Sequence, residues 1–210
     1  GNGGTPIVSD ILAEADRRAR HPLLCYVNAD IILMDDFIVA VRRAQEQCQE
    51  LTQWQKFLLI SSRFNLDIDA PINLAAGWQA GLRSRALKEG KMYPAAGSDF
   101  FVYPRGLFTD VPPFALGRGY WDNWLMYAAT RRGAALIDAT SDVLAVHQNH
   151  DYSHISGLMP GSRSDWELLS RAQGVENLRL AGGYGKLYTV YDRIWFRLKT
   201  RQGKHSPMKL

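Results

Sequence analysis

The chain has few cysteines and no long apolar run, and these absences exclude several classes of protein. Its 210 residues include only two cysteines, Cys25 and Cys48, which lie far apart and form no Cys-x-x-Cys pair. A disulfide framework and a cysteine zinc site are therefore excluded, and we interpret both cysteines as buried thiols in a reducing compartment. The apolar runs at 23–27 and 31–34 fall far below the roughly 18 to 20 residues that span a bilayer. We therefore expect a cytoplasmic protein with no transmembrane segment.

No strong excess of one charge is present either. The formal net charge is +4, and much of the excess lies in the last stretch of the chain, which we interpret as a solvated basic tail. The sequence contains no basic stripe interleaved with aromatic residues and no nucleic-acid motif, so we expect no nucleic-acid partner.

Hydrophobic residues make up 46% of the chain, enough for a compact core, and their spacing predicts alternating helices and strands. One helix is expected to begin after Thr5, which we expect to be its capping residue. Another is expected to begin at about Asp122. Two more are expected at 35–50 and around Trp78 and Leu82. Buried strands are expected at 23–27, 56–61, 100–103, 134–138 and 143–147, whereas 63–69 is predicted to be irregular. This alternation indicates an α/β protein with an open mixed, mostly parallel sheet and helices on both faces.

A short acidic motif, Asn28-Ala29-Asp30, follows the first predicted strand directly. Ligands collect at the carboxyl edge of open α/β sheets, and a carboxylate there is able to hold Mg²⁺ or Mn²⁺ against a diphosphate. The alternative is an ordinary turn, for which Asn and Asp are favoured residues.

A glycine-rich segment, Gly117-Arg118-Gly119, precedes Asp122 at the start of a predicted helix. In this position the carboxylate of Asp122 projects towards whatever the loop surrounds, which suits a general base. The alternative is a helix-capping aspartate flanked by core tryptophans.

Three histidines, His147, His150 and His154, lie within eight residues after a predicted strand. Imidazole is able to ligate a metal or donate to a phosphate, although structural or surface histidines remain the alternative. The pair Asp67 and Asp69 also has metal-ligand spacing, but we interpret it as part of a loop.

Together these motifs resemble the GT-A fold glycosyltransferases, most closely the family 2 type and a bacterial and plant group of nucleotide-diphospho-sugar transferase-like proteins. The segment CYVNADIIL stands where such enzymes have a strand ending in Asp-x-Asp, and GRGYWDNWLMYAATRRGAALIDATSDVLAVH follows the order of their later motifs. Two positions depart from the pattern. Asn28 replaces the first acid, and Trp121 replaces the customary Glu beside the base.

The resemblance implies an inverting transfer of a sugar from a nucleotide-diphosphate sugar to a carbohydrate or other hydroxyl acceptor. Asp122 is then the general base, and Asp30 with His147 holds Mn²⁺ or Mg²⁺. The residues expected to contact the substrates are Asn28, Asp30, Asp99, Arg118 and Trp121.

The resemblance also divides the chain. Residues 1–155 are expected to form a GT-A-like catalytic core that lacks the first, base-binding βα units of such enzymes. Residues 156–210 are expected to form an extension of loops and short helices with the basic tail. We therefore expect the chain to be part of a longer protein.

Two other functions remain open from the residues alone. One is a metal-dependent phosphoester hydrolase using Asp30 with His147 and His150. The other is a non-catalytic or degenerate module that binds a sugar or an anion.

Overall fold

The structure is a computed structural model that describes residues 4–50, 56–93, 98–150 and 163–183, with two short strands at 195–197 and 207–208. For 163–171 and for those two strands only the backbone is described.

The larger of two β-sheets has the strand order β1-β6-β3-β7-β9-β10. Its strands are β1 (Leu23–Val27), β6 (Phe100–Pro104), β3 (Lys56–Ile60), β7 (Ala134–Asp138), β9 (Trp195–Arg197) and β10 (Pro207–Met208). β3 pairs in parallel with β7, and β7 in parallel with β9, whereas β6 runs antiparallel to both β1 and β3. The expectation of one mostly parallel sheet is therefore wrong, because the chain forms two open mixed sheets in which antiparallel pairs predominate.

The reversed strand β6 explains this difference. Because β1 and β3 are both antiparallel to β6, they run in the same direction as each other and as β7. The apolar pattern of a strand does not indicate the direction in which it runs, so the sequence could not show that β6 is antiparallel to its neighbours. Among the described strands β1 lies at the edge of the sheet, and its Cys25 is exposed, so our expectation of two buried thiols holds only for Cys48.

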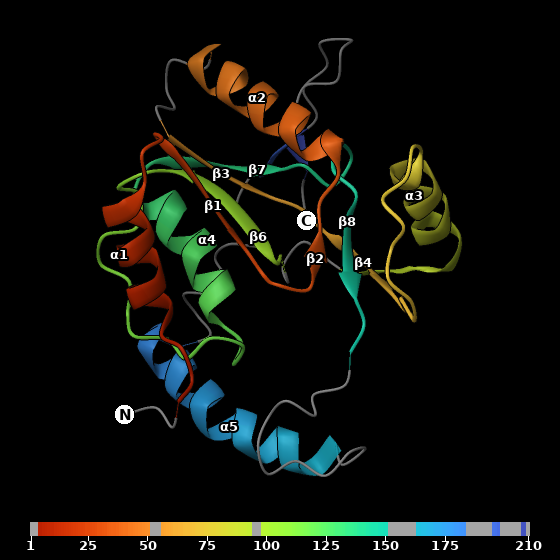
Figure 1. The fold of residues 1–210 in the computed structure, drawn as a ribbon. Helices are drawn as coiled ribbons and strands as arrows, with labels where there is room; N and C mark the ends of the chain where they lie inside the picture. Colours follow the sequence, from red (N-terminus) through yellow and green to blue (C-terminus); the bar gives the residue numbers. More distant parts are fainter. Residues whose placement is uncertain are drawn as a thin grey trace.

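Helices cover both faces of the larger sheet, as the sequence predicted (Figure 1). On one face α1 (Val8–Arg18) and α4 (Trp121–Arg131) pack against Leu58 and Ile60 of β3. On the other face α2 (Asp35–Glu50) packs against Phe57 and Leu59 of the same strand. The alternation of side chains along a strand therefore divides the apolar run of β3 between two cores.

The smaller sheet has the order β2-β8-β4-β5 and packs against α3 (Trp78–Glu89). Its strands are β2 (Ile31–Ile32), β8 (Ala145–Gln148), β4 (Arg63–Leu66) and β5 (Lys91–Tyr93). The segment after Ser62 was expected to be irregular, but its first four residues form β4. Alternation over only four residues is too short to identify a strand without its neighbours.

The chain crosses from the larger sheet to the smaller one three times, from β1 to β2, from β3 to β4 and from β7 to β8. Since β1, β3 and β7 run in the same direction, all three crossings leave from the same edge of the larger sheet (Figure 1). Residues on these crossings are therefore brought together.

The first and the last helix of the described chain pack into the same core as α4. Helix α1 begins at Val8 after Ile7, which makes no side-chain cap, so Thr5 is not the capping residue that the sequence suggested. Helix α5 (Arg163–Leu180) is 18 residues long and ends against the core through Ala181.

The division of the chain at residue 155 stays a prediction. In the part of the chain that the structure describes, no helix has the length and apolarity needed to cross a membrane.

Candidate functional site

The three crossings position the candidate residues. Asn28 and Asp30 lie between β1 and β2, and Arg63 begins β4 after only two residues that follow β3. Asp99 directly precedes β6, and because β6 is antiparallel, the pairing of Val27 with Phe100 brings Asp99 beside Asn28. The pairing of Ile31 with His147 places β8 next to the same turn.

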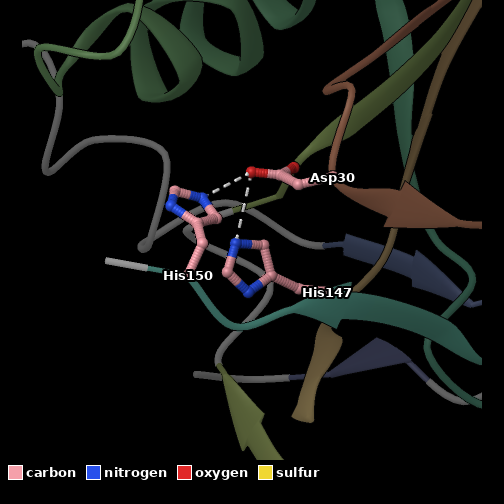
Figure 2. A group of neighbouring side chains, drawn as sticks. All are labelled: Asp30, His147 and His150. Atoms are coloured by element: carbon pink, nitrogen blue, oxygen red, sulfur yellow. Dashed lines mark hydrogen bonds and ion pairs between the residues drawn. The ribbon is translucent and has the colours of Figure 1, made fainter. Parts of the chain in front are cut away.

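Asp30, His147 and His150 form a compact group (Figure 2). The Oδ2 atom of Asp30 lies 3.4 Å from Nε2 of His147 and 3.1 Å from Nε2 of His150. The backbone also ties the group together, because the amide of Gln148 donates to the carbonyl of Asp30 at 3.0 Å. The transferase interpretation of the sequence paired Asp30 with His147 alone as metal ligands, whereas the hydrolase alternative also included His150.

The two histidines set the charge state of Asp30. Hydrogen bonding to His147 and, more weakly, to His150 lowers the pKa of Asp30 to about 2, against the opposing effect of its partial burial. The carboxylate is therefore ionised throughout the physiological pH range, as a metal ligand must be.

The group fits a divalent metal ion by its donor set and by two unpaired atoms. Among the described residues, Oδ1 of Asp30 and Nδ1 of His147 are buried without a hydrogen-bond partner. One carboxylate oxygen and two imidazole nitrogens lie within 4.8 Å of one another, close enough to share an ion. Carboxylate suits Mn²⁺ and Mg²⁺, whereas imidazole favours a transition metal, so this mixed set fits Mn²⁺ better than Mg²⁺.

A polar network continues from this group on the side of β6. The hydroxyl of Tyr26 donates to Oδ1 of Asn28 at 2.7 Å, and Nδ2 of Asn28 donates to Oδ1 of Asp99 at 2.7 Å. The other carboxylate oxygen of Asp99 forms an ion pair with Arg63. Asn28 therefore serves as a neutral bridge between Tyr26 and Asp99, a role that an amide fills and a carboxylate does not. Both oxygens of Asp99, expected to contact a sugar, have partners within the protein.

Arg63 is a site residue that the sequence analysis missed. Its Nε donates to Oδ1 of Asn65 at 2.9 Å, and its guanidinium lies 4.6 Å from the centre of the Tyr93 ring. The positive charge of Arg63 also acts on Asp122. No local signal marked Arg63, because its position depends on β4 joining the smaller sheet.

Asp122 lies in the first turn of α4 in a partly buried position. Its Oδ1 accepts hydrogen bonds from the backbone amide of Asn123 at 2.9 Å and from the side-chain amide of Asn123 at 3.1 Å. Loss of hydration raises the pKa of Asp122, with the Asn123 hydrogen bonds and the charge of Arg63 acting in the opposite direction. A carboxylate with a raised pKa is a stronger base.

An aromatic contact connects helix α4, which carries Asp122, with the strand that precedes Asp30. The ring of Trp121 packs edge-on against that of Tyr26 with centroids 5.3 Å apart, and Tyr26 leads through Asn28 to Asp30. Trp121 is only 5% exposed, so its ring serves the core. Its expected contact with an acceptor sugar stays a prediction.

The remaining candidates have other partners or are exposed. Arg118 donates from Nε to Oε1 of Gln173 at 2.6 Å, and Asp67 accepts from the side chain of Asn149 at 2.7 Å. Asp69 is exposed. His154 and the basic tail lie outside the residues whose side chains the structure describes.

Comparison of the chain with protein-family models, with curated proteins and with solved structures finds no match. The functional argument therefore depends on the residues of the site.

Proposed function

We propose that this protein is a metal-dependent glycosyltransferase that moves a sugar from a nucleotide-diphosphate sugar to a hydroxyl acceptor with inversion. The observation that carries the proposal is the contact of Asp30, after β1, with His147 and His150. Within the described part of the chain, Oδ1 of Asp30 has no hydrogen-bond partner. The GT-A resemblance of the motifs supports the same assignment.

The ligands would be Asp30, His147 and His150, and a bound Mn²⁺ would neutralise the negative charge that develops on the leaving diphosphate. Asp30 binds as a carboxylate because its pKa of about 2 keeps it ionised. The network of Tyr26, Asn28 and Asp99 holds the turn that carries Asp30 in place.

Asp122 accepts the proton of the acceptor hydroxyl as that oxygen attacks the anomeric carbon opposite the leaving diphosphate. Its Oδ1 is already held by Asn123, so Oδ2 takes the proton. Burial of Asp122 supports this role because it raises the pKa and so the basicity of the carboxylate.

The test is thermal unfolding of the protein with Mn²⁺ and a panel of nucleoside diphosphates and nucleotide sugars. Ligands that bind only the folded state raise the unfolding temperature, so we expect a shift with one nucleotide that requires Mn²⁺ and disappears in Asp30→Asn. Asp69→Asn is the matched control, because Asp69 had metal-ligand spacing in the sequence but is exposed away from the group. The absence of a metal-dependent shift with every nucleotide would contradict the proposal.

A metal-dependent phosphoester hydrolase is the second candidate, because its three expected residues, Asp30, His147 and His150, are the ones that meet. The two functions differ in their need for an acceptor. A hydrolase releases phosphate from a generic phosphoester such as p-nitrophenyl phosphate in the presence of Mn²⁺. A transferase instead releases a nucleoside diphosphate at a rate that rises with the concentration of a hydroxyl acceptor.

A further inference from the structure

Helix α5 holds the loop that precedes α4 through one buried side chain. Asn177 is 1% exposed. Its Oδ1 accepts from the amide of Ala115 at 2.9 Å, and its Nδ2 donates to the carbonyls of Ala115 at 2.9 Å and Gly119 at 3.0 Å. Both polar atoms of the amide are therefore used to fix the backbone of the 115–119 loop, and a buried amide satisfied in this way is expensive to remove.

Two neighbours of Asn177 on α5 contact the same loop. Gln173 accepts from Arg118, and Gly174 lies so close that a Cβ atom there would stand 3.1 Å from the carbonyl oxygen of Arg118. Residues 173, 174 and 177 share one side of the helix, as their spacing requires. In Figure 1 the darker end of α5 accordingly lies close to α1 and α4.

The loop ends in a strained turn. Tyr120 has a φ of 66° and is, within the described part of the chain, the one non-glycine residue with a positive φ. The amide of Trp121 closes the turn by donating to the carbonyl of Gly119 at 2.9 Å. A bulky residue keeps this unfavourable backbone conformation only where its surroundings impose it. Asn177 binds the same carbonyl of Gly119, two residues before the helix residue Trp121 and three before Asp122.

We propose that Asn177 and Gly174 are positioning residues for Asp122, because they hold the 115–120 loop in the strained turn that aims the first turn of α4. Both residues are buried, so they would act on Asp122 through the loop. The consequence for sugar transfer rests on the proposed function, but the placement of Asp122 does not, since it can be measured without any substrate.

The first measurement follows the Asp122 carboxyl carbon by ¹³C NMR over a pH titration, in the wild type and in Asn177→Ala. If α5 holds the loop, Asn177→Ala lets the carboxylate reach water, and its titration midpoint falls towards the ordinary range of aspartate. A folded Asn177→Ala protein whose Asp122 titrates as in the wild type would overturn the proposal, because Asn177 would then serve only overall stability.

Gly174→Ala tests the same contact without removing a hydrogen bond. Alanine strengthens a helix relative to glycine, so α5 itself is not weakened, while the new Cβ presses on the carbonyl of Arg118. Gly81→Ala in α3 is the matched control, because a Cβ there meets nothing within 4 Å. We expect Gly174→Ala to shift the Asp122 midpoint and Gly81→Ala to leave it unchanged. Equal midpoints in the two variants would contradict the proposal, even if Asn177→Ala did not fold.

The kinetic measurement separates this proposal from the proposed function. If the protein transfers sugar, Gly174→Ala should lower kcat by roughly tenfold or more and leave KM for the donor unchanged, because only the base is displaced. A shifted Asp122 midpoint in a protein that transfers no sugar would support the positioning role and reject the transferase. If the protein transfers sugar but Gly174→Ala changes neither the Asp122 midpoint nor kcat, the transferase is supported and the positioning role is rejected.

Discussion

Asp30 and Asp122 are two carboxylates of the candidate site, and their surroundings move their pKa values in opposite directions. Asp30 lies partly buried on a crossing between the sheets, where two histidines lower its pKa to about 2. Asp122 lies in the first turn of α4, where burial raises its pKa. Two carboxylates whose environments separate them in this way are suited to different tasks, one as a permanently charged ligand and the other as a proton acceptor. Under the proposed function, Asp30 would therefore bind the metal ion and Asp122 would accept the proton.

The largest expected effect comes from Asp122→Asn. Removal of the base should lower transfer by roughly 10²- to 10⁴-fold, measured as acceptor-dependent release of nucleoside diphosphate. Asn can still accept from Asn123 through Oδ1, so the fold is kept. Unchanged transfer in this variant would exclude Asp122 as the base.

The same variant should be more stable than the wild type at neutral pH. Because burial raises the pKa of Asp122, the folded protein binds its proton more tightly than the unfolded chain, and the penalty exists only where the group is ionised. Urea unfolding at several pH values should show the advantage of Asp122→Asn at pH 7, and it should disappear as the pH falls and the wild-type carboxyl takes up its proton. Asp110→Asn, at an exposed position, is the control.

Asp30→Asn tests the other carboxylate of the pair. We expect it to weaken Mn²⁺ binding by roughly a hundredfold or more, measured by calorimetric titration. Without metal it should also be less stable than the wild type. A lowered pKa stabilises the fold above the pKa of the unfolded chain, so this difference is present at pH 7 and is lost between about pH 4 and the folded pKa of about 2. Mn²⁺ affinity equal to that of the wild type would remove Asp30 from the metal site.

Asn28→Asp is expected to have a smaller and less intuitive effect. It creates an Asp-x-Asp motif at residues 28–30, but the new carboxylate would face Asp99, whose Oδ1 is only 2.7 Å from Nδ2 of Asn28. Loss of the donated hydrogen bond and repulsion between the two acids should destabilise the protein by about 1–3 kcal/mol in urea unfolding. A stability equal to that of the wild type would show that Asn28 does not bridge to Asp99.

Tyr26→Phe should give the smallest effect, because it removes one hydroxyl donor to Asn28 and keeps the ring contact with Trp121. We expect a loss of about 1 kcal/mol in urea unfolding, with Mn²⁺ affinity little changed. A large loss of metal affinity would mean that the turn at Asp30 depends on Tyr26 more than the contacts indicate.

Local patterns in the sequence predicted most of the elements and part of the site. The strand at 134–138 and the helix at 35–50 have the expected bounds, because each carries a complete apolar pattern. Asp30 and His147 were expected to share a metal ion because of the resemblance of the motifs to GT-A enzymes. Strand direction, the second sheet and the site residue Arg63 were not predictable, because each depends on which strands pair, and pairing joins residues far apart in the chain. The polar network that surrounds Asn28 and Asp99 was hidden for the same reason.

The crossing from β3 to β4 consists of only Ser61 and Ser62, both buried. Side chains alternate along a strand, so insertion of a single residue there would turn β4 over and move Arg63 to the opposite face of the smaller sheet. The length of this two-residue link thus sets the orientation of the cation that serves both Asp99 and Asp122. We therefore expect this link to tolerate a change in length less well than loops that carry no site residue.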